Sequence, residues 1–173
     1  KHTDGKILDQ VASWFINNFD NWAIDVKVSG APVLELVLNQ ATKPEGFNVN
    51  LADVGQGMSQ ALPIIVRAFM PDSNLLIVIE QPELHLHQAV HGNVAELLVT
   101  SAVSQQNSYL IETHSENFIL RLRRLIAEGA IKPNDVALYS IESQDLSCIA
   151  KRIPVNSDGG VDYWPEGVFA EGF

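Results

Sequence analysis

The sequence contains a single cysteine, Cys148, among 173 residues. One thiol cannot form an internal disulfide, and it cannot supply a cysteine cluster for a metal ion. The apolar runs are far shorter than the ~20 residues that a membrane-spanning helix needs. No apolar stretch follows the polar amino-terminal residues as it does in a signal peptide. We therefore expect a protein of the reducing cytoplasm that has no membrane contact.

Basic residues are also scarce. The chain has 11 Lys and Arg against 21 Asp and Glu, and its formal net charge is −10 at pH 7. Nucleic-acid backbones are bound by clustered Lys and Arg, so this acidic chain is not expected to bind DNA by itself. Its one basic cluster, Arg121, Arg123 and Arg124, is interpreted as the solvated face of a helix.

The sequence also lacks an initiator methionine, and we interpret it as a fragment or a trimmed form of a longer protein. Its length suffices for one domain with a core. Residues 1–50 predict a helix over Ile7–Asn18 and then a hairpin of two strands, Ile24–Val28 and Val33–Leu38. Residues 51–155 are the expected core of the domain. Residues 156–173, rich in Gly and Pro, are an irregular tail.

The core alternates helices with strands, which predicts an α/β fold with a mainly parallel sheet, flanking helices and a hairpin at its edge. Leu75–Ile79 is a run of five apolar residues, typical of a strand buried on both faces. The expected helices are 58–70, 89–104 and 115–129, and the further strands are 108–112, 136–141 and 146–153, the last two around a turn at Glu142–Asp145. In such sheets ligands bind at the carboxyl ends of the strands.

Polar residues follow two of these strands. Leu75–Ile79 is followed by Glu80-Gln81-Pro82-Glu83, and the strand over 108–111 by Glu112-Thr113-His114-Ser115. A carboxylate at the tip of a buried strand is costly without a cation or a donor, and Mg²⁺ favours such oxygens. The simpler interpretations are that the first strand reaches solvent at Glu80, and that His114 is an ordinary polar residue rather than a proton carrier or ligand.

A third segment, Asp53–Gln60, contains Gly55 and Gly57 before the first core helix. Glycines allow close approach of the backbone to a ligand, and a helix amino terminus attracts anions. A Gly-x-Gly pair is also common in ordinary loops. Only together with the two strand ends does this segment point to a nucleotide site.

Taken in order, these segments resemble the carboxyl-terminal half of an ABC-type ATPase, in the AAA family group of SMC-, RecF- and OLD-like proteins of prokaryotes. Leu75–Gln81 resembles the Walker B strand, and Pro82–His87, in the form Pro-Glu-Leu-His-Leu-His, resembles the D-loop. Thr113-His114-Ser115 resembles the switch-histidine loop. Asp53–Gln60 resembles a divergent signature motif.

The resemblance implies a P-loop NTPase fold and a cytoplasmic ATPase that dimerises around ATP and acts in DNA transactions or anti-phage defence. Glu80 would hold Mg²⁺, while Gln81 and His114 would be the catalytic groups near the γ-phosphate. The signature segment would contact ATP held by a second copy in a homodimer, and Glu83 and His85 would lie near that interface. The residues implied in cofactor binding are Gly55, Gly57, Ser59, Gln60 and Glu83.

Three departures qualify this resemblance. No Gly-x-x-x-x-Gly-Lys-Ser/Thr occurs in the sequence, so the loop that cradles the phosphates is absent from it. We therefore expect that this chain requires a Walker A half as its partner. Gln81 stands where the family has Glu, and a neutral amide orients water without accepting its proton. Gln81 is therefore a natural variant with slow turnover or a substitution that traps ATP. Asp53 stands where Ser is frequent, so either Ser59 takes that role or Asp53 caps the helix.

Three other interpretations remain open. The chain could be a catalytically inactive interaction module that keeps an ATPase fold, which Gln81 and the absent cradle favour. A metal site could use Glu83, His85, His87 and His91, although these side chains need not converge. A nuclease would need acidic ligands after His114, where Asp135, Glu142 and Asp145 are more simply strand-end residues.

Overall fold

The computed structural model describes residues 3–30, 33–43, 46–145 and 147–165. The amino-terminal part begins with helix α1 (Thr3–Asn18), which packs on an antiparallel sheet of β1 (Trp22–Val28), β2 (Leu34–Gln40) and β3 (Asn48–Asn50). The predicted hairpin is confirmed, with Ile24 opposite Leu38 and both side chains buried. The third strand, β3, pairs antiparallel with β2, a pairing that the sequence did not predict.

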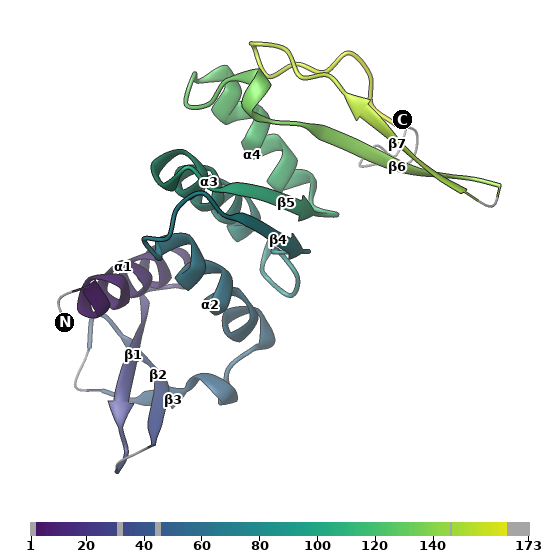
Figure 1. The fold of residues 1–173 in the computed structure, drawn as a ribbon. Coiled ribbons are helices and arrows are strands. Elements are labelled where there is room, and N and C mark those ends of the chain that lie inside the picture. Colours follow the sequence, from purple (N-terminus) through teal and green to yellow (C-terminus); the bar gives the residue numbers. More distant parts are fainter. Residues whose placement is uncertain (1–2, 31–32, 44–45, 146, 166–173) are drawn as a thin grey trace.

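The central part alternates helices with parallel strands, as predicted. A short 3-10 helix η1 (Leu51–Asp53) leads into α2 (Gln56–Phe69), β4 (Leu76–Glu80), α3 (Gln88–Gln105), β5 (Ser108–Glu112) and α4 (Glu116–Ala127). In Figure 1 the arrows of β4 and β5 lie side by side and point the same way, in register from the Leu76–Ser108 pair to the Glu80–Glu112 pair. Their carboxyl ends therefore share one edge.

The main core lies where α1, α2, α3 and the start of α4 meet the inner side of β4 and β5. Phe15, Ile65, Val94 and Phe118 are almost completely buried there. On the strands, Ile79, Tyr109 and Ile111 pack against this core. Alternate residues of a strand point to opposite faces of the sheet. The residues next to these three along each strand therefore point away from the core.

That other face of β4 and β5 is open. Leu76 is 69 % exposed, Val78 61 % and Leu110 61 %. The expectation that Leu75–Ile79 is buried on both faces is therefore wrong for the described residues, because helices cover only the inner face. We call Leu76, Val78 and Leu110 the outer apolar face. A parallel sheet is ordinarily covered on both sides.

Beyond α4, a 3-10 helix η2 (Pro133–Asp135) leads to an antiparallel hairpin of β6 (Leu138–Gln144) and β7 (Ser147–Ile153), which extends away from the other strands in Figure 1. The α/β class is confirmed, but among the described residues parallel pairing is limited to β4 and β5. The turn expected over Glu142–Asp145 is shorter than predicted, because β6 continues to Gln144. The Lys151 amine of β7 donates a hydrogen bond to the Glu142 carboxylate at 2.5 Å. That hydrogen bond raises the pKa of the Lys151 amine.

The basic cluster on α4 is not a uniformly solvated face, so that expectation was wrong. Arg121 bonds to Glu96 of α3, and Arg123 Nε donates to the Gly159 carbonyl at 2.7 Å. Only Arg124 is exposed, and its hydrogen bond to Glu128 raises the pKa of its guanidinium. Arg123 thereby holds the irregular segment after β7 against α4. The predicted tail from residue 166 onward lies outside the described residues.

No helix within the described ranges combines the length and the apolar character that crossing a bilayer would require.

Candidate functional site

Two carboxylates stand side by side at the carboxyl ends of the parallel strands. Glu80 ends β4, Glu112 ends β5, and the two are register partners with exposed side chains. Adjacent strands lie ~4.8 Å apart, so like charges at paired positions repel. No described residue donates a hydrogen bond to the Glu80 carboxylate. The sequence singled out Glu80 but not Glu112, whose relevance depends on the strand register.

His114 follows Glu112 in the loop Thr113–Ser115, which we call the histidine loop. Its side chain is 76 % exposed, and its Nε2 atom lies 3.4 Å from Oε1 of Glu112. Glu80, Glu112 and His114 thus gather at one sheet edge, as the sequence predicted for Glu80 and His114.

Gln81 lies at the same edge and begins the connection to α3. Its backbone N–H donates to the carbonyl of Glu112 at 2.8 Å, which continues the strand pairing by one residue. Its φ is +46°, in the left-handed region that non-glycine residues rarely adopt. Such a conformation persists where surrounding contacts fix it. The backbone of Gln81 is therefore fixed beside Glu112, and its side chain is half-buried.

The segment Pro82–His87, which we call the acidic turn, carries the buried carboxylate of Glu83. Glu83 is only 7 % exposed. Its Oε1 accepts hydrogen bonds from the Thr113 hydroxyl at 2.7 Å and from the His114 backbone N–H at 2.9 Å. The sequence placed Glu83 among the ligand-contacting residues, whereas the structure turns its carboxylate inward onto the histidine loop.

A second connection between the acidic turn and the histidine loop passes through His91 of α3. The Nε2 atom of His91 lies 3.0 Å from the Leu86 carbonyl, and Nδ1 lies 2.7 Å from the Ser115 hydroxyl. The carbonyl can only accept, so Nε2 donates to it, and in the neutral ring Nδ1 then accepts from the Ser115 hydroxyl. The same hydroxyl accepts from the Phe118 N–H and caps α4.

The alternative of a metal site on Glu83, His85, His87 and His91 is wrong for the described residues. They contain no group of three or more His, Cys, Asp or Glu side chains that could hold a metal ion. His87 instead caps α3 by accepting from the Ala89 N–H, while Glu83 and His91 are engaged with the histidine loop. Because these bonds point in different directions, the four side chains do not converge.

The start of α2 lies against the acidic turn. Gly57 is buried, and a Cβ atom at this position would lie 2.4 Å from the carbonyl oxygen of His85. Only glycine permits this approach without a shift of backbone. Gly55 is the amino-terminal cap residue of α2 and faces open space, and Ser59 donates to the Gln56 carbonyl. Gln60 is exposed.

Asp53 does not cap α2, which corrects one of the two predictions for this residue. Gly55 occupies the cap position, and no side chain bonds to the first turn from there. Asp53 belongs instead to the preceding 3-10 helix, whose cap is Asn50. The Asp53 side chain therefore accepts no hydrogen bond from the backbone N–H groups at the start of α2.

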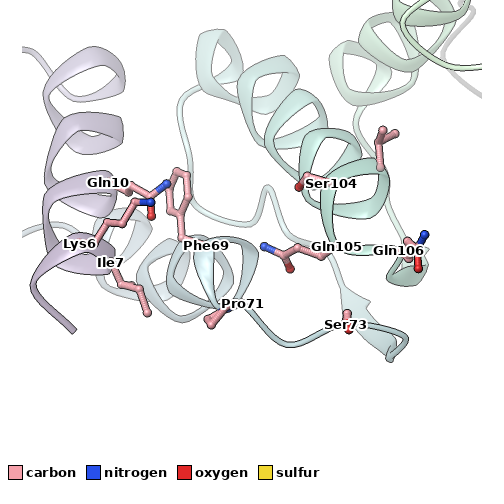
Figure 2. A pocket seen from close by; sticks show the side chains of 10 residues that line it. Lys6, Ile7, Gln10, Phe69, Pro71, Ser73, Ser104, Gln105 and Gln106 are labelled. Carbon is pink, nitrogen blue, oxygen red and sulfur yellow. The ribbon is translucent and has the colours of Figure 1, made fainter. Parts of the chain in front are cut away.

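A hollow of about 520 Å³ lies at the opposite edge of β4 and β5. Figure 2 shows side chains from the start of α1, the end of α2 and the end of α3 around it, including Lys6, Phe69 and Gln105. Gln105 is committed to the fold, because its amide donates to the Ala68 carbonyl at 2.9 Å. The hollow is therefore separate from the residues gathered at the carboxyl ends of the strands.

Comparisons with known proteins agree with this architecture. A family model described as an AAA ATPase domain matches residues 1–119. Among curated proteins, no sequence matches the chain. Solved structures share the fold at low sequence identity, and three of them are described next.

The first structure comes from work on ATP-driven dimerization and DNA stimulated activation of SMC ATPases. It matches with a TM-score of 0.63 and 12% identity, over 87% of this chain and 85% of that chain. A SmcHead bound to the C-winged helix domain of ScpA matches with a TM-score of 0.61 and 13% identity, over 86% and 42% of the two chains. An Smc head domain with a coiled coil and joint derived from Pyrococcus yayanosii gives 0.58 and 12%, over 88% and 27%.

Proposed function

Because the chain belongs to the AAA ATPase domain family, we propose that it is one half of an ATP-binding and slowly hydrolysing site. In this proposal it contributes the cation carboxylate, the switch histidine and a signature segment. The missing phosphate cradle comes from a Walker A half, in the same protein or a longer parent chain. The observation that carries the proposal is the gathering of Glu80, Glu112 and His114 at the end of β4 and β5.

The donor set at this edge suits Mg²⁺. Glu80 is an exposed carboxylate without a protein donor among the described residues, and Glu112 adds negative charge beside it. Mg²⁺ keeps several waters and takes one or two carboxylates together with phosphate oxygens. Glu80 would hold the ion, directly or through water, and the ion would neutralise charge on the phosphates. The described residues supply no comparable cradle for the phosphates themselves.

Gln81 and His114 would act on the terminal phosphate and the attacking water. The Gln81 amide can orient a water molecule but cannot accept its proton, so turnover is expected to be slow. His114 projects into solvent from a fixed backbone, with Glu112 3.4 Å from its ring. An imidazole in this position can donate to a phosphate oxygen.

The outer apolar face is the proposed binding surface for the Walker A half. Leu76, Val78 and Leu110 are exposed beside the carboxylates, so a partner that covers them would also approach Glu80 and His114. Complete burial of each such side chain contributes about 1.5–3 kcal/mol. A Walker A half that covers this face would bury the parallel sheet on both sides, as is usual for such sheets.

The start of α2 would contact the ATP that a second copy of the chain binds. Gly55, Gly57, Ser59 and Gln60 lie in or next to its first turn, where unpaired backbone N–H groups favour an anion. In a homodimer this turn would contact the γ-phosphate of ATP held by the other copy. The ATP-dependent opening and closing of such a dimer would drive DNA transactions or anti-phage defence, by analogy with related folds.

The test uses the chain together with its Walker A half, or the longer parent protein, and measures ATP binding and single-turnover hydrolysis. We expect Mg²⁺-dependent binding that Glu80→Gln weakens. Gln81→Glu should raise the hydrolysis rate by at least about tenfold, because it restores a general base. Gln144→Glu, an exposed substitution at the end of β6, is the control and should leave the rate unchanged. An unchanged rate in Gln81→Glu would contradict the assigned role.

A catalytically inactive interaction module is the second candidate, favoured by the amide at position 81. Such a module would keep the fold and the surface that binds a second copy or a partner, but it would no longer bind nucleotide. The two candidates predict different results for ATP binding by the chain together with its Walker A half: the ATPase binds ATP, and the module does not. Failure to bind ATP in the presence of the Walker A half would support the module and exclude the ATPase.

A further inference from the structure

We propose that Glu83 is a positioning residue that fixes the backbone of His114, so that a displacement of the acidic turn moves the switch histidine. This inference rests on the proposed function for the role of His114 in catalysis. Its structural part concerns only the contact between two segments, and it can be tested without nucleotide.

The contact is directed at the backbone rather than at the imidazole. Glu83 Oε1 accepts from the His114 N–H at 2.9 Å and from the Thr113 hydroxyl at 2.7 Å. Thr113 Oγ1 in turn accepts from the Ser115 N–H at 3.1 Å. All three residues of the histidine loop are therefore tied, directly or through Thr113, to one carboxylate, while the ring of His114 stays exposed.

Among the described residues, the Glu83 carboxylate accepts hydrogen bonds only from the histidine loop. Glu83 is 93 % buried, and its Oε2 atom, also buried, accepts no hydrogen bond from any described residue. A buried carboxylate is costly unless donors compensate it. Both donors that reach Glu83 come from the histidine loop, so separating the two segments would leave the charge without compensation. The acidic turn and the histidine loop are expected to move together.

The acidic turn is also in contact with the start of α2. One residue with left-handed backbone directly precedes it and another lies within it, with φ of +46° at Gln81 and +62° at His85. The carbonyl of His85 faces Gly57 closely. A displacement of the first turn of α2, such as binding of a second copy's nucleotide would cause, therefore reaches the acidic turn and, through Glu83, His114.

The first experiment follows the backbone amide of His114 by ¹H–¹⁵N NMR and hydrogen exchange in the full chain. Glu83→Ala removes the acceptor, and exchange at His114 should become about 10- to 100-fold faster because a charge-assisted bond is lost. Glu83→Gln retains a side-chain oxygen that can accept both bonds, and it should restore most of the protection. The Phe118 amide, bonded to Ser115, reports on general loosening and should change much less.

His91→Phe is the matched control, because it cuts the other connection between the acidic turn and the histidine loop. The proposal requires that His114 protection survive in this variant. Equal protection of His114 in Glu83→Ala and the unaltered chain would overturn the inference. Equal loss in Glu83→Ala and His91→Phe would also overturn it, since Glu83 would then have no particular role.

The second experiment measures hydrolysis by the protein completed with its Walker A half. Glu83→Ala should lower kcat by at least about tenfold with little change in KM, because only an interaction of the transition state is lost. Glu83→Gln should recover most of kcat. If the completed protein hydrolyses no ATP, the proposed function fails, while the NMR result still decides the structural role of Glu83. Normal kcat in Glu83→Ala would overturn the coupling.

Discussion

The backbone of Gly57 faces the carbonyl oxygen of His85 at a distance that leaves no room for a side chain, since a Cβ atom would lie 2.4 Å from that oxygen. We expect Gly57→Ala to lower the free energy of unfolding by about 1–3 kcal/mol, because the backbone must shift to relieve the overlap. Urea denaturation followed by circular dichroism measures this loss.

Gly55→Ala is the control for the preceding variant, two residues away. Gly55 faces open space, and its φ of −57° suits alanine. Alanine is a weaker cap than glycine but restricts the unfolded chain, so the net change should stay below about 1 kcal/mol. Equal losses in the two variants would contradict the close contact between α2 and the acidic turn.

The outer apolar face should matter for association and not for the folding of this chain. We expect Leu110→Lys to change the free energy of unfolding by less than about 0.5 kcal/mol, because Leu110 is already exposed. It should weaken binding of the Walker A half at least about tenfold, since the interface would have to bury an unpaired charge. Titration calorimetry provides the comparison.

Val103→Lys on α3 is the control, because Val103 is similarly exposed but lies away from the outer apolar face. It should leave the affinity unchanged. If both lysine variants bind the Walker A half as tightly as the unaltered chain, the partner does not use this face.

Ser115 joins two parts of the site through one hydroxyl. It caps α4 by accepting from Phe118, and it bonds to His91. Ser115→Ala should reduce the free energy of unfolding by about 1–2 kcal/mol through loss of the cap and of a buried hydrogen bond. Thermal and urea denaturation would show it. Ser13→Ala on the exposed side of α1 should cost less than about 0.5 kcal/mol, and a comparable loss there would argue against a special role of Ser115.

The chain by itself should not bind duplex DNA at physiological salt. Its net charge is −10, and Arg121 and Arg123 are engaged with Glu96 and the Gly159 carbonyl. Nucleic-acid affinity depends on cations that can release counterions from phosphates. Fluorescence anisotropy with a labelled duplex should show no saturable binding. Saturable binding that weakens steeply with added salt would contradict this prediction.

Much of the fold was predictable because it depends on local patterns. The alternating apolar and polar residues near Ile24 indicated the hairpin, and Ser115 before an amphipathic stretch indicated the start of α4. The apolar run before Glu80 indicated a strand, but its composition could not show that only one face would be covered. Coverage depends on elements from elsewhere in the sequence.

The sequence by itself determined which residues end the two central strands, and therefore placed Glu80 and His114 at one edge of an α/β domain. The tertiary structure decided what surrounds them. The register brought Glu112 beside Glu80, and the packing turned Glu83 inward onto the backbone of His114. The reason is physical: a strand end follows from nearby residues, whereas a hydrogen bond between residues 31 positions apart exists only once helices and strands have packed.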